Sequence, residues 1–150
     1  MAQRPPRCWH GSTTTRCSPR RGWSRGRIRH AFDVRHDSFR CAAFIDLVRA
    51  YNVALVCTDA ARPRLMDVTA DFVYCRLQGA APPACGYDNV TLDAWAGRIK
   101  AWADGDEPVD AERCGEKARF RKRDVFVIFD SDRKARAPAN AAELMRRLRA

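Results

Sequence analysis

The segment at residues 124–149 constrains the fold most, because a strand, a turn and a helix can all be recognised in it. Residues 125–129, VFVIF, form an unbroken apolar run rich in β-branched and aromatic side chains, which is typical of a parallel strand buried on both faces. The chain turns polar at Asp130, and an amphipathic pattern with proline in its first turn predicts a helix over 137–149. The sequence therefore predicts a β-loop-α unit with polar groups at the carboxyl end of its strand, where α/β proteins build their sites.

A second unit is predicted upstream. Residues 30–36, HAFDVRH, alternate apolar and charged side chains, and this alternation predicts a strand with charges on one face. A helix follows, for which Ser38 is the expected cap. Its expected apolar stripe consists of Phe44, Leu47, Val48 and Tyr51.

Two more strands are predicted at residues 53–57, VALVC, and 72–77, FVYCRL. In the latter, alternation places Val73, Cys75 and Leu77 on the apolar face. A second amphipathic helix has the stripe Leu92, Trp95, Ala96, Ile99, Trp102 and Ala103. Four strands that alternate with helices predict a parallel α/β sheet. The charged segment at 105–123, ahead of the last strand, is predicted to be a solvated loop.

The basic charge of the chain is concentrated at its start. The 150 residues carry a formal net charge of +10. Residues 1–29 contain eight arginines and no acid, or +8, whereas residues 30–150 contain 20 Lys and Arg against 18 Asp and Glu, or +2. Outside the first 29 residues, composition therefore gives no reason to expect nucleic-acid binding, and no apolar run is long enough to predict a membrane span.

Residues 1–29 lack any apolar periodicity, so we expect a disordered basic tail ahead of one domain at 30–150. A nucleic-acid arm, a targeting peptide, and a metal site made by Cys8, His10 and Cys17 are three functional interpretations. No apolar segment of a secretion signal follows, and the cysteine and histidine spacings lack paired ligands. An acid-free mixture of Arg, Pro, Gly, Ser, Cys and Trp is also typical of GC-rich DNA translated out of frame, so the tail is a candidate for non-native sequence.

Once these segments are placed in order, the chain resembles the YecE-like family, also called domain of unknown function seventy-two. The resemblance rests on HAFDVRHDSF, VALVCTD, FVYCRLQG, Gly86-Tyr87, LDAWAGRI and DVFVIFDSD with APANA. It implies the C-terminal half, about four βα units, of a TIM-type barrel, because a complete barrel takes roughly 250 residues. The chain departs from the family pattern at Gln78, Ser131 and Asp33, where histidine, asparagine and glutamate are usual.

The candidate site residues gather at the predicted carboxyl ends of the strands. His36, Asp59 and Asp130 are the candidate acid-base groups. Arg35 and Arg76 suit a phosphate or carboxylate, and we add Gln78 and Tyr87 as substrate-binding candidates. The competing interpretation is that the arginines and the aspartates, with Asp33, satisfy one another as a structural network.

These residues leave two function classes open. One is an enzyme that acts on a small anionic substrate at the barrel mouth, and the other is a non-catalytic remnant or interaction module. We expect no cofactor and no metal, because no ligand spacing supports His36 with the aspartates as a hard-ion site. Half a barrel leaves open sheet edges, so we expect self-association, and turnover only if two copies form a pseudo-complete barrel.

Cysteine usage indicates the compartment. The chain has seven cysteines and no CxxC pair, and Cys57 and Cys75 lie inside apolar runs. Buried free thiols of this kind are expected in a reducing cytosol rather than in a disulfide framework. We therefore expect a cytoplasmic protein.

The tail assignment can be tested by hydrogen exchange. We expect fast amide exchange throughout residues 1–29 and slow exchange in the periodic segments of 30–149, because only the latter can bury apolar surface. Slow amides between Arg4 and Arg27 would contradict a disordered tail.

Overall fold

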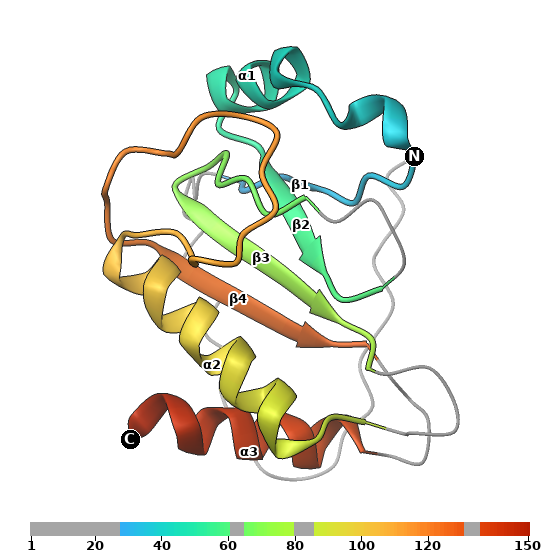
Figure 1. The fold of residues 1–150 in the computed structure, drawn as a ribbon, viewed down its shortest axis with the longest axis vertical. Coiled ribbons are helices and arrows are strands. Elements are labelled where there is room, and N and C mark those ends of the chain that lie inside the picture. Colours follow the sequence, from blue (N-terminus) through green and yellow to red (C-terminus); the bar gives the residue numbers. More distant parts are fainter. Residues whose placement is uncertain (1–27, 61–64, 80–85, 131–135) are drawn as a thin grey trace, which may run out of the picture.

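A computed structural model describes residues 28–60, 65–79, 86–130 and 136–150. Its described strands form one all-parallel sheet in the order β1-β2-β3-β4 (Figure 1). The strands are β1 (Ala31–Phe32), β2 (Ala54–Thr58), β3 (Phe72–Leu77) and β4 (Asp124–Phe129). The helices are α1 (Ala42–Ala50), α2 (Asn89–Asp104) and α3 (Ala137–Arg149), with a 3-10 turn η1 at Asp37–Phe39. The predicted parallel α/β class is confirmed.

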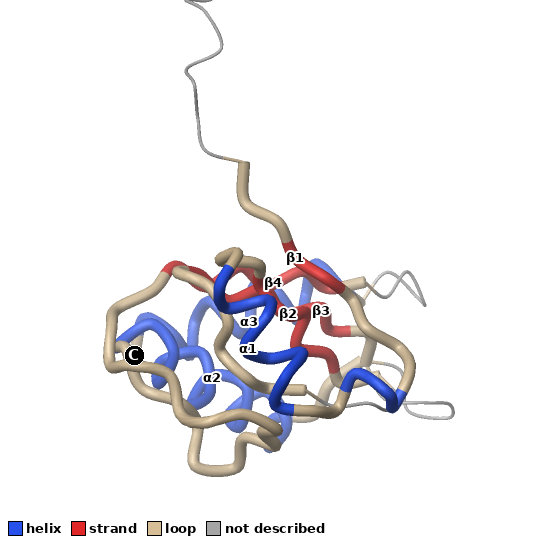
Figure 2. Tube along the Cα trace, turned by 90° about the horizontal axis from the view of Figure 1, so that it is seen from above, coloured by secondary structure: helices blue, strands red, loops and turns tan. Residues whose placement is uncertain are grey.

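The helices lie on one side of the sheet (Figure 2). One core cluster places α2 and α3 against the inward side chains of β2, β3 and β4, and a second places α1 against Leu55 of β2. The opposite face, which we call the open face, carries Val56, Tyr74, Arg76, Phe126 and Ile128. Its composition follows from strand register, since Tyr74 pairs with both Val56 and Phe126, and Arg76 pairs with Ile128.

The prediction that residues 125–129 are buried on both faces is wrong. The strand exists, but Phe126 is 43% exposed and Ile128 is 46% exposed, while Val125, Val127 and Phe129 pack against the core. The continuous apolar run concealed this difference, because sequence shows that a side chain is apolar and not whether a second layer covers it.

Two predictions near the start of the domain are also wrong. The strand expected at 30–36 is confined to Ala31–Phe32, which is an edge of the described sheet. Ser38 does not cap α1, because it lies within η1 and its backbone N–H donates to His36 Nδ1 at 3.2 Å. Cys41 occupies the N-cap of α1 and makes no side-chain capping bond.

The apolar stripe predicted for α1 is rotated from the one observed. Ile45 and Val48 are buried, whereas Leu47 is 55% exposed and Tyr51 is 74% exposed. Ile45 was missed because Phe44, Leu47, Val48 and Tyr51 follow the helical period equally well. Packing against Leu55 and Leu65 selects the face that is used.

Helix α2 follows its prediction closely. Leu92, Trp95, Ala96, Ile99 and Trp102 are its buried residues, although Ala103 is only partly buried. Asp88 caps the helix by accepting from the Thr91 N–H at 2.7 Å. Gly105 ends it with φ of 107°, and a Cβ there would lie 2.7 Å from the Arg121 carbonyl carbon.

A buried extended segment, residues 65–69, stands between β2 and β3. Leu65, Met66, Asp67, Val68 and Thr69 are all buried. The Asp67 carboxylate is satisfied by the backbone N–H groups of Cys114 and Gly115, the latter at 2.8 Å. A charged side chain thereby ties the segment to the loop at 105–123, part of which is buried where the sequence predicted a solvated loop.

Arg147 fastens α3 to α2. Its Nε donates to Asp93 Oδ1 at 2.6 Å and its Nη2 donates to Asn89 Oδ1 at 2.9 Å. Glu143 accepts from Arg147 and from Arg146 Nη2, the latter at 2.7 Å. These contacts, the Arg146 hydrogen bond above all, lower the pKa of Glu143 to about 2.

This depressed pKa predicts a pH dependence of stability. The pKa of Glu143 is lower in the folded chain than the ordinary value of about 4.3. The stability that its charge contributes is therefore present above about pH 4.3 and lost as the pH falls toward about 2. We expect Glu143→Gln to lower the urea midpoint at neutral pH, and the difference from wild type to shrink on acidification. The control is Glu116→Gln, and equal pH profiles for both variants would contradict the assignment.

Candidate functional site

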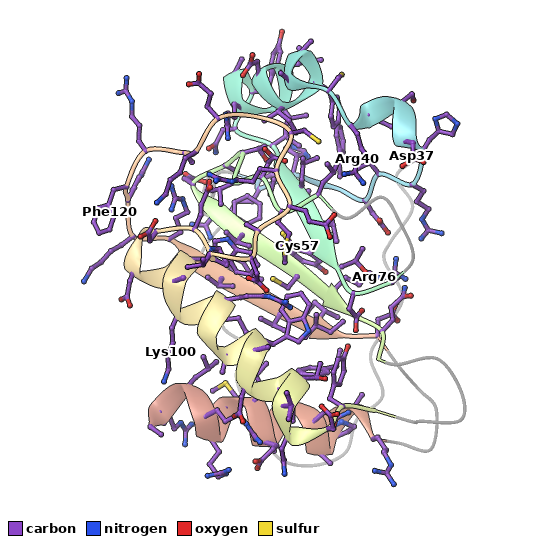
Figure 3. The ribbon with its side chains drawn as sticks, viewed as in Figure 1. Asp37, Arg40, Cys57, Arg76, Lys100 and Phe120 are labelled. Carbon is purple, nitrogen blue, oxygen red and sulfur yellow. The ribbon has the colours of Figure 1, made fainter. Side chains whose placement is uncertain are left out.

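The candidate site lies along the carboxyl rim, the edge of the sheet at which its parallel strands end. Asp33 follows β1, Asp59 follows β2, Arg76 is the second-last residue of β3 and Asp130 follows β4. Figure 3 shows Arg76 at that end of β3. Because all described strands run in one direction, residues far apart in the sequence meet at this edge.

The Arg76 cluster, made of Asp33, Arg35, Arg76 and Asp130, is the larger of two groups on this rim. Arg76 Nε donates to Asp130 Oδ2 at 2.6 Å, its Nη2 also contacts that oxygen, and its Nη1 donates to Asp33 Oδ2 at 2.7 Å. The Arg35 Nη2 donates to the same Asp33 oxygen at 3.2 Å. The prediction that Arg76 pairs with a carboxylate such as Asp33 or Asp130 is confirmed, and the structure shows both pairs.

The Arg76 side chain is 31% exposed, so the expectation that a strand arginine paired with carboxylates is buried is wrong, and Arg76 is half-buried. Its hydrogen bonds to Asp130 first, and then to Asp33, raise the pKa of the guanidinium. Two arginines and two aspartates give the cluster no net charge. A single exposed ion pair contributes little to stability, whereas several charges that share partners, as in this cluster, contribute more.

The Asp59 cluster is the second group. Asp59 Oδ1 accepts from the Gln78 N–H at 2.8 Å, and its Oδ2 accepts from the Gly79 N–H at 3.0 Å and from the Tyr87 hydroxyl. The Tyr87 oxygen also accepts from the Gly79 N–H at 2.7 Å. Burial, followed by the hydrogen bond to Asp59, raises the pKa of Tyr87 well above its usual range, so the phenol stays protonated.

His36 lies apart from both clusters in its described contacts. Its Nδ1 is 2.8 Å from Ser38 Oγ and accepts from the Ser38 N–H. It is exposed, and the described hydrogen bonds of its ring go to Ser38. The structure thus joins Arg35, Arg76 and Asp130 in one cluster, and Asp59, Tyr87 and the Gln78 amide in another. Ser131, the remaining departure from the family pattern, lies outside the described residues.

A cavity of about 300 Å³ borders the Asp59 cluster on the helical side of the sheet. Asp59, Met66 and Trp95 contribute to its lining, as does Arg98. The Arg98 guanidinium lies 4.7 Å from the Trp95 ring and donates from Nε to Asp110 at 2.9 Å. The charge of Arg98 is thus matched by Asp110.

Sequence reasoning missed two buried carboxylates. The Glu107 side chain is 2% exposed, accepts from the Ala118 N–H at 3.0 Å and pairs with Arg113 at 2.8 Å. Asp67 is buried in a similar setting. Both accept hydrogen bonds from backbone N–H groups of the loop at 105–123. No periodic pattern in the sequence marks either position.

This geometry defines an α/β protein with an all-parallel sheet, whose polar side chains gather at the carboxyl rim. A family model, described as Protein of unknown function DUF72, matches residues 13–150. The chain belongs to this family, which confirms the resemblance found in the sequence. Comparison with curated proteins and with solved structures gave no match.

The family match begins within the basic tail, since residues 13–29 fall inside it. The structure describes the chain from residue 28 onward. The boundary at residue 29 and the non-native origin of the tail therefore stay predictions. None of the described helices has the length and apolar character needed to span a membrane.

The role of Arg76 can be tested by stability. Arg76→Met would leave Asp33 and Asp130 close together without their shared cation, so we expect a lower urea midpoint than for wild type. Arg149→Met, which changes an exposed arginine at the end of α3, is the matched control. If both variants unfold like wild type, the cluster contributes nothing to the fold.

Proposed function

We propose that the carboxyl rim binds a small anion bearing a phosphate or carboxylate group, and that the intact fold is an enzyme acting on such a substrate. The observation that carries this proposal is the shared carboxylate of Asp33, which holds the guanidinium groups of Arg35 and Arg76 side by side. Two adjacent guanidinium groups suit the oxygens of one phosphate or carboxylate.

The donor count supports binding. A guanidinium has five N–H donors, and Arg76 uses three of them on Asp130 and Asp33. One N–H on Nη1 and one on Nη2 are left over by these contacts. The Arg35 side chain is 75% exposed and spends one hydrogen bond on Asp33. Both side chains therefore have donors for an incoming anion.

The remaining candidates take supporting roles in this proposal. Asp130 and His36 are the proposed acid-base groups, because Asp130 has an exposed carboxylate within the Arg76 cluster and His36 has an exposed imidazole three residues beyond Asp33. Asp59 has both oxygens engaged by donors, which suits it to hold Gln78 and Tyr87 in place beside the ligand. No cofactor enters the proposal.

A non-catalytic module is the alternative, and one observation favours it. Arg76 is already matched by two carboxylates, as expected of a structural network. On this view the rim orders the strand ends, and the chain acts as an interaction module or is a remnant without chemistry of its own.

We also propose that the sheet is an arc of a TIM-type barrel and that its open edges support self-association. The parallel strand order, which follows the chain, supports the first point. The position of β1 and β4 at the two edges of the described sheet supports the second. The free, buried thiols of Cys57 and Cys75 support a reducing, cytosolic setting.

Ligand binding is best tested with inorganic phosphate. We expect Arg35→Gln to weaken phosphate binding about tenfold, because a hydrogen bond to a charged group contributes about 1.5–3 kcal/mol. Arg149→Gln is the control and is expected to bind like wild type. Binding would be followed by shifts in the amide NMR signals of Arg76 and Gln78. Phosphate that leaves these signals unmoved, or affects both variants equally, would contradict the anion site and favour the non-catalytic module.

A further inference from the structure

The open face and the two edges of the described sheet both offer surface to a further partner. Strands of all-parallel sheets are normally covered on both faces, yet Phe126 and Ile128 are 43% and 46% exposed. Strands β1 and β4 end the described sheet, which leaves the outer backbone groups of each without a strand partner. One occupant that covers the face and pairs both edges would satisfy all of these features.

The sheet also curls toward its open face. Arg29, just before β1, donates from Nη1 to Asp124 of β4 at 2.8 Å, and its guanidinium lies 5.3 Å from the Phe72 ring. At the other end, Arg76 joins Asp33 to Asp130. Three spacings of about 4.8 Å would separate β1 from β4 by roughly 14 Å in a flat sheet. The Arg29–Asp124 contact, which joins the start of β1 to β4, therefore indicates that the face is concave.

We propose that two copies of this chain close into one eight-stranded parallel barrel, with β1 of each copy paired to β4 of the other. A two-fold axis along the strand direction keeps all strands parallel and creates two identical seams. It leaves no sheet edge, which only closure achieves. This inference rests on the self-association proposed above and not on the proposed ligand.

Charge complementarity along the seams favours a second copy. The β1 segment carries arginines at both ends, Arg29 before the strand and Arg35 beyond it. Strand β4 carries aspartates at both ends, Asp124 and Asp130, which are exposed. Pairing β1 with the β4 of another copy brings Arg29 toward Asp124 and Arg35 toward Asp130, twice per dimer. Within one chain Arg29 already pairs with Asp124, and Asp130 already pairs with Arg76, so in the dimer each aspartate would share or exchange its cation with the other copy.

The interior of such a barrel would be filled by the open face. Tyr74, Phe126 and Ile128 lie on that face and would stack in layers with their copies, as side chains do inside parallel barrels. The short β1 also gains an explanation. Its alternating sequence continues to His36, and a neighbouring strand would supply the partner that extends its pairing.

Sedimentation velocity on the full chain tests this proposal. We expect wild type to sediment as a dimer and Phe126→Lys to shift the population toward monomer, because the lysine would be buried without a counter-charge. Phe120→Lys is the matched control, since Phe120 is 76% exposed on the loop at 105–123. It is expected to stay dimeric.

A second pair of variants guards against misfolding. Ile128→Lys, with Val109→Lys as its control, repeats the test at another position of the open face, and circular dichroism checks that each variant keeps its helices. A compact wild-type monomer that melts cooperatively would overturn both self-association and the dimer. A wild type that forms a range of larger species would retain self-association and overturn the closed dimer. Equal effects of the open-face and control variants would also overturn it.

Discussion

The hydrogen bonds that Arg76 makes to Asp33 and Asp130 hold the carboxyl rim together. These residues belong to β3, to the segment after β1 and to the segment after β4, so one side chain spans the described sheet. Parallel strands have no tight turns to fix their relative positions, because each connection must cross back over the sheet. A cation between two carboxylates supplies a direct link between strand ends. It also places Arg35 beside Arg76, and the proposed anion site depends on that placement.

The two faces of the sheet divide structure from proposed function. The helical face is closed by apolar side chains of α1, α2 and α3, together with the buried segment 65–69. Two buried carboxylates on this side, Asp67 and Glu107, accept hydrogen bonds from backbone N–H groups. The open face carries Arg76 and the exposed Phe126 and Ile128. Binding and association are therefore proposed on this face, because a guanidinium with N–H donors left over lies beside exposed apolar side chains there.

The sequence predicted what local pattern controls. Strand β3 lies where FVYCRL was expected, with Val73, Cys75 and Leu77 buried, because strict alternation leaves one choice of face. The partners of Arg76 were predictable too, since a strand-end arginine needs a carboxylate and two aspartates follow neighbouring strands. The sequence failed where the tertiary neighbour decides. The predicted buried stripe of α1 is rotated from the observed one. Phe126 and Ile128 were predicted to be buried, but the described helices cover only one face of their strand. The tie between Asp59 and Tyr87 needed the fold, because these residues are 28 positions apart and joined by no motif.

A double-mutant cycle tests the central claim most directly, that Arg76 couples the ends of β1 and β4 through β3. Urea unfolding at one fixed protein concentration would compare Arg76→Met, Asp33→Asn and Asp130→Asn with the two double variants that include Arg76→Met. The account predicts non-additive effects in both cycles, because each aspartate loses its contribution once the guanidinium is gone. Effects that add within error in both cycles would show that Arg76 does not bridge the strands, and would contradict the account.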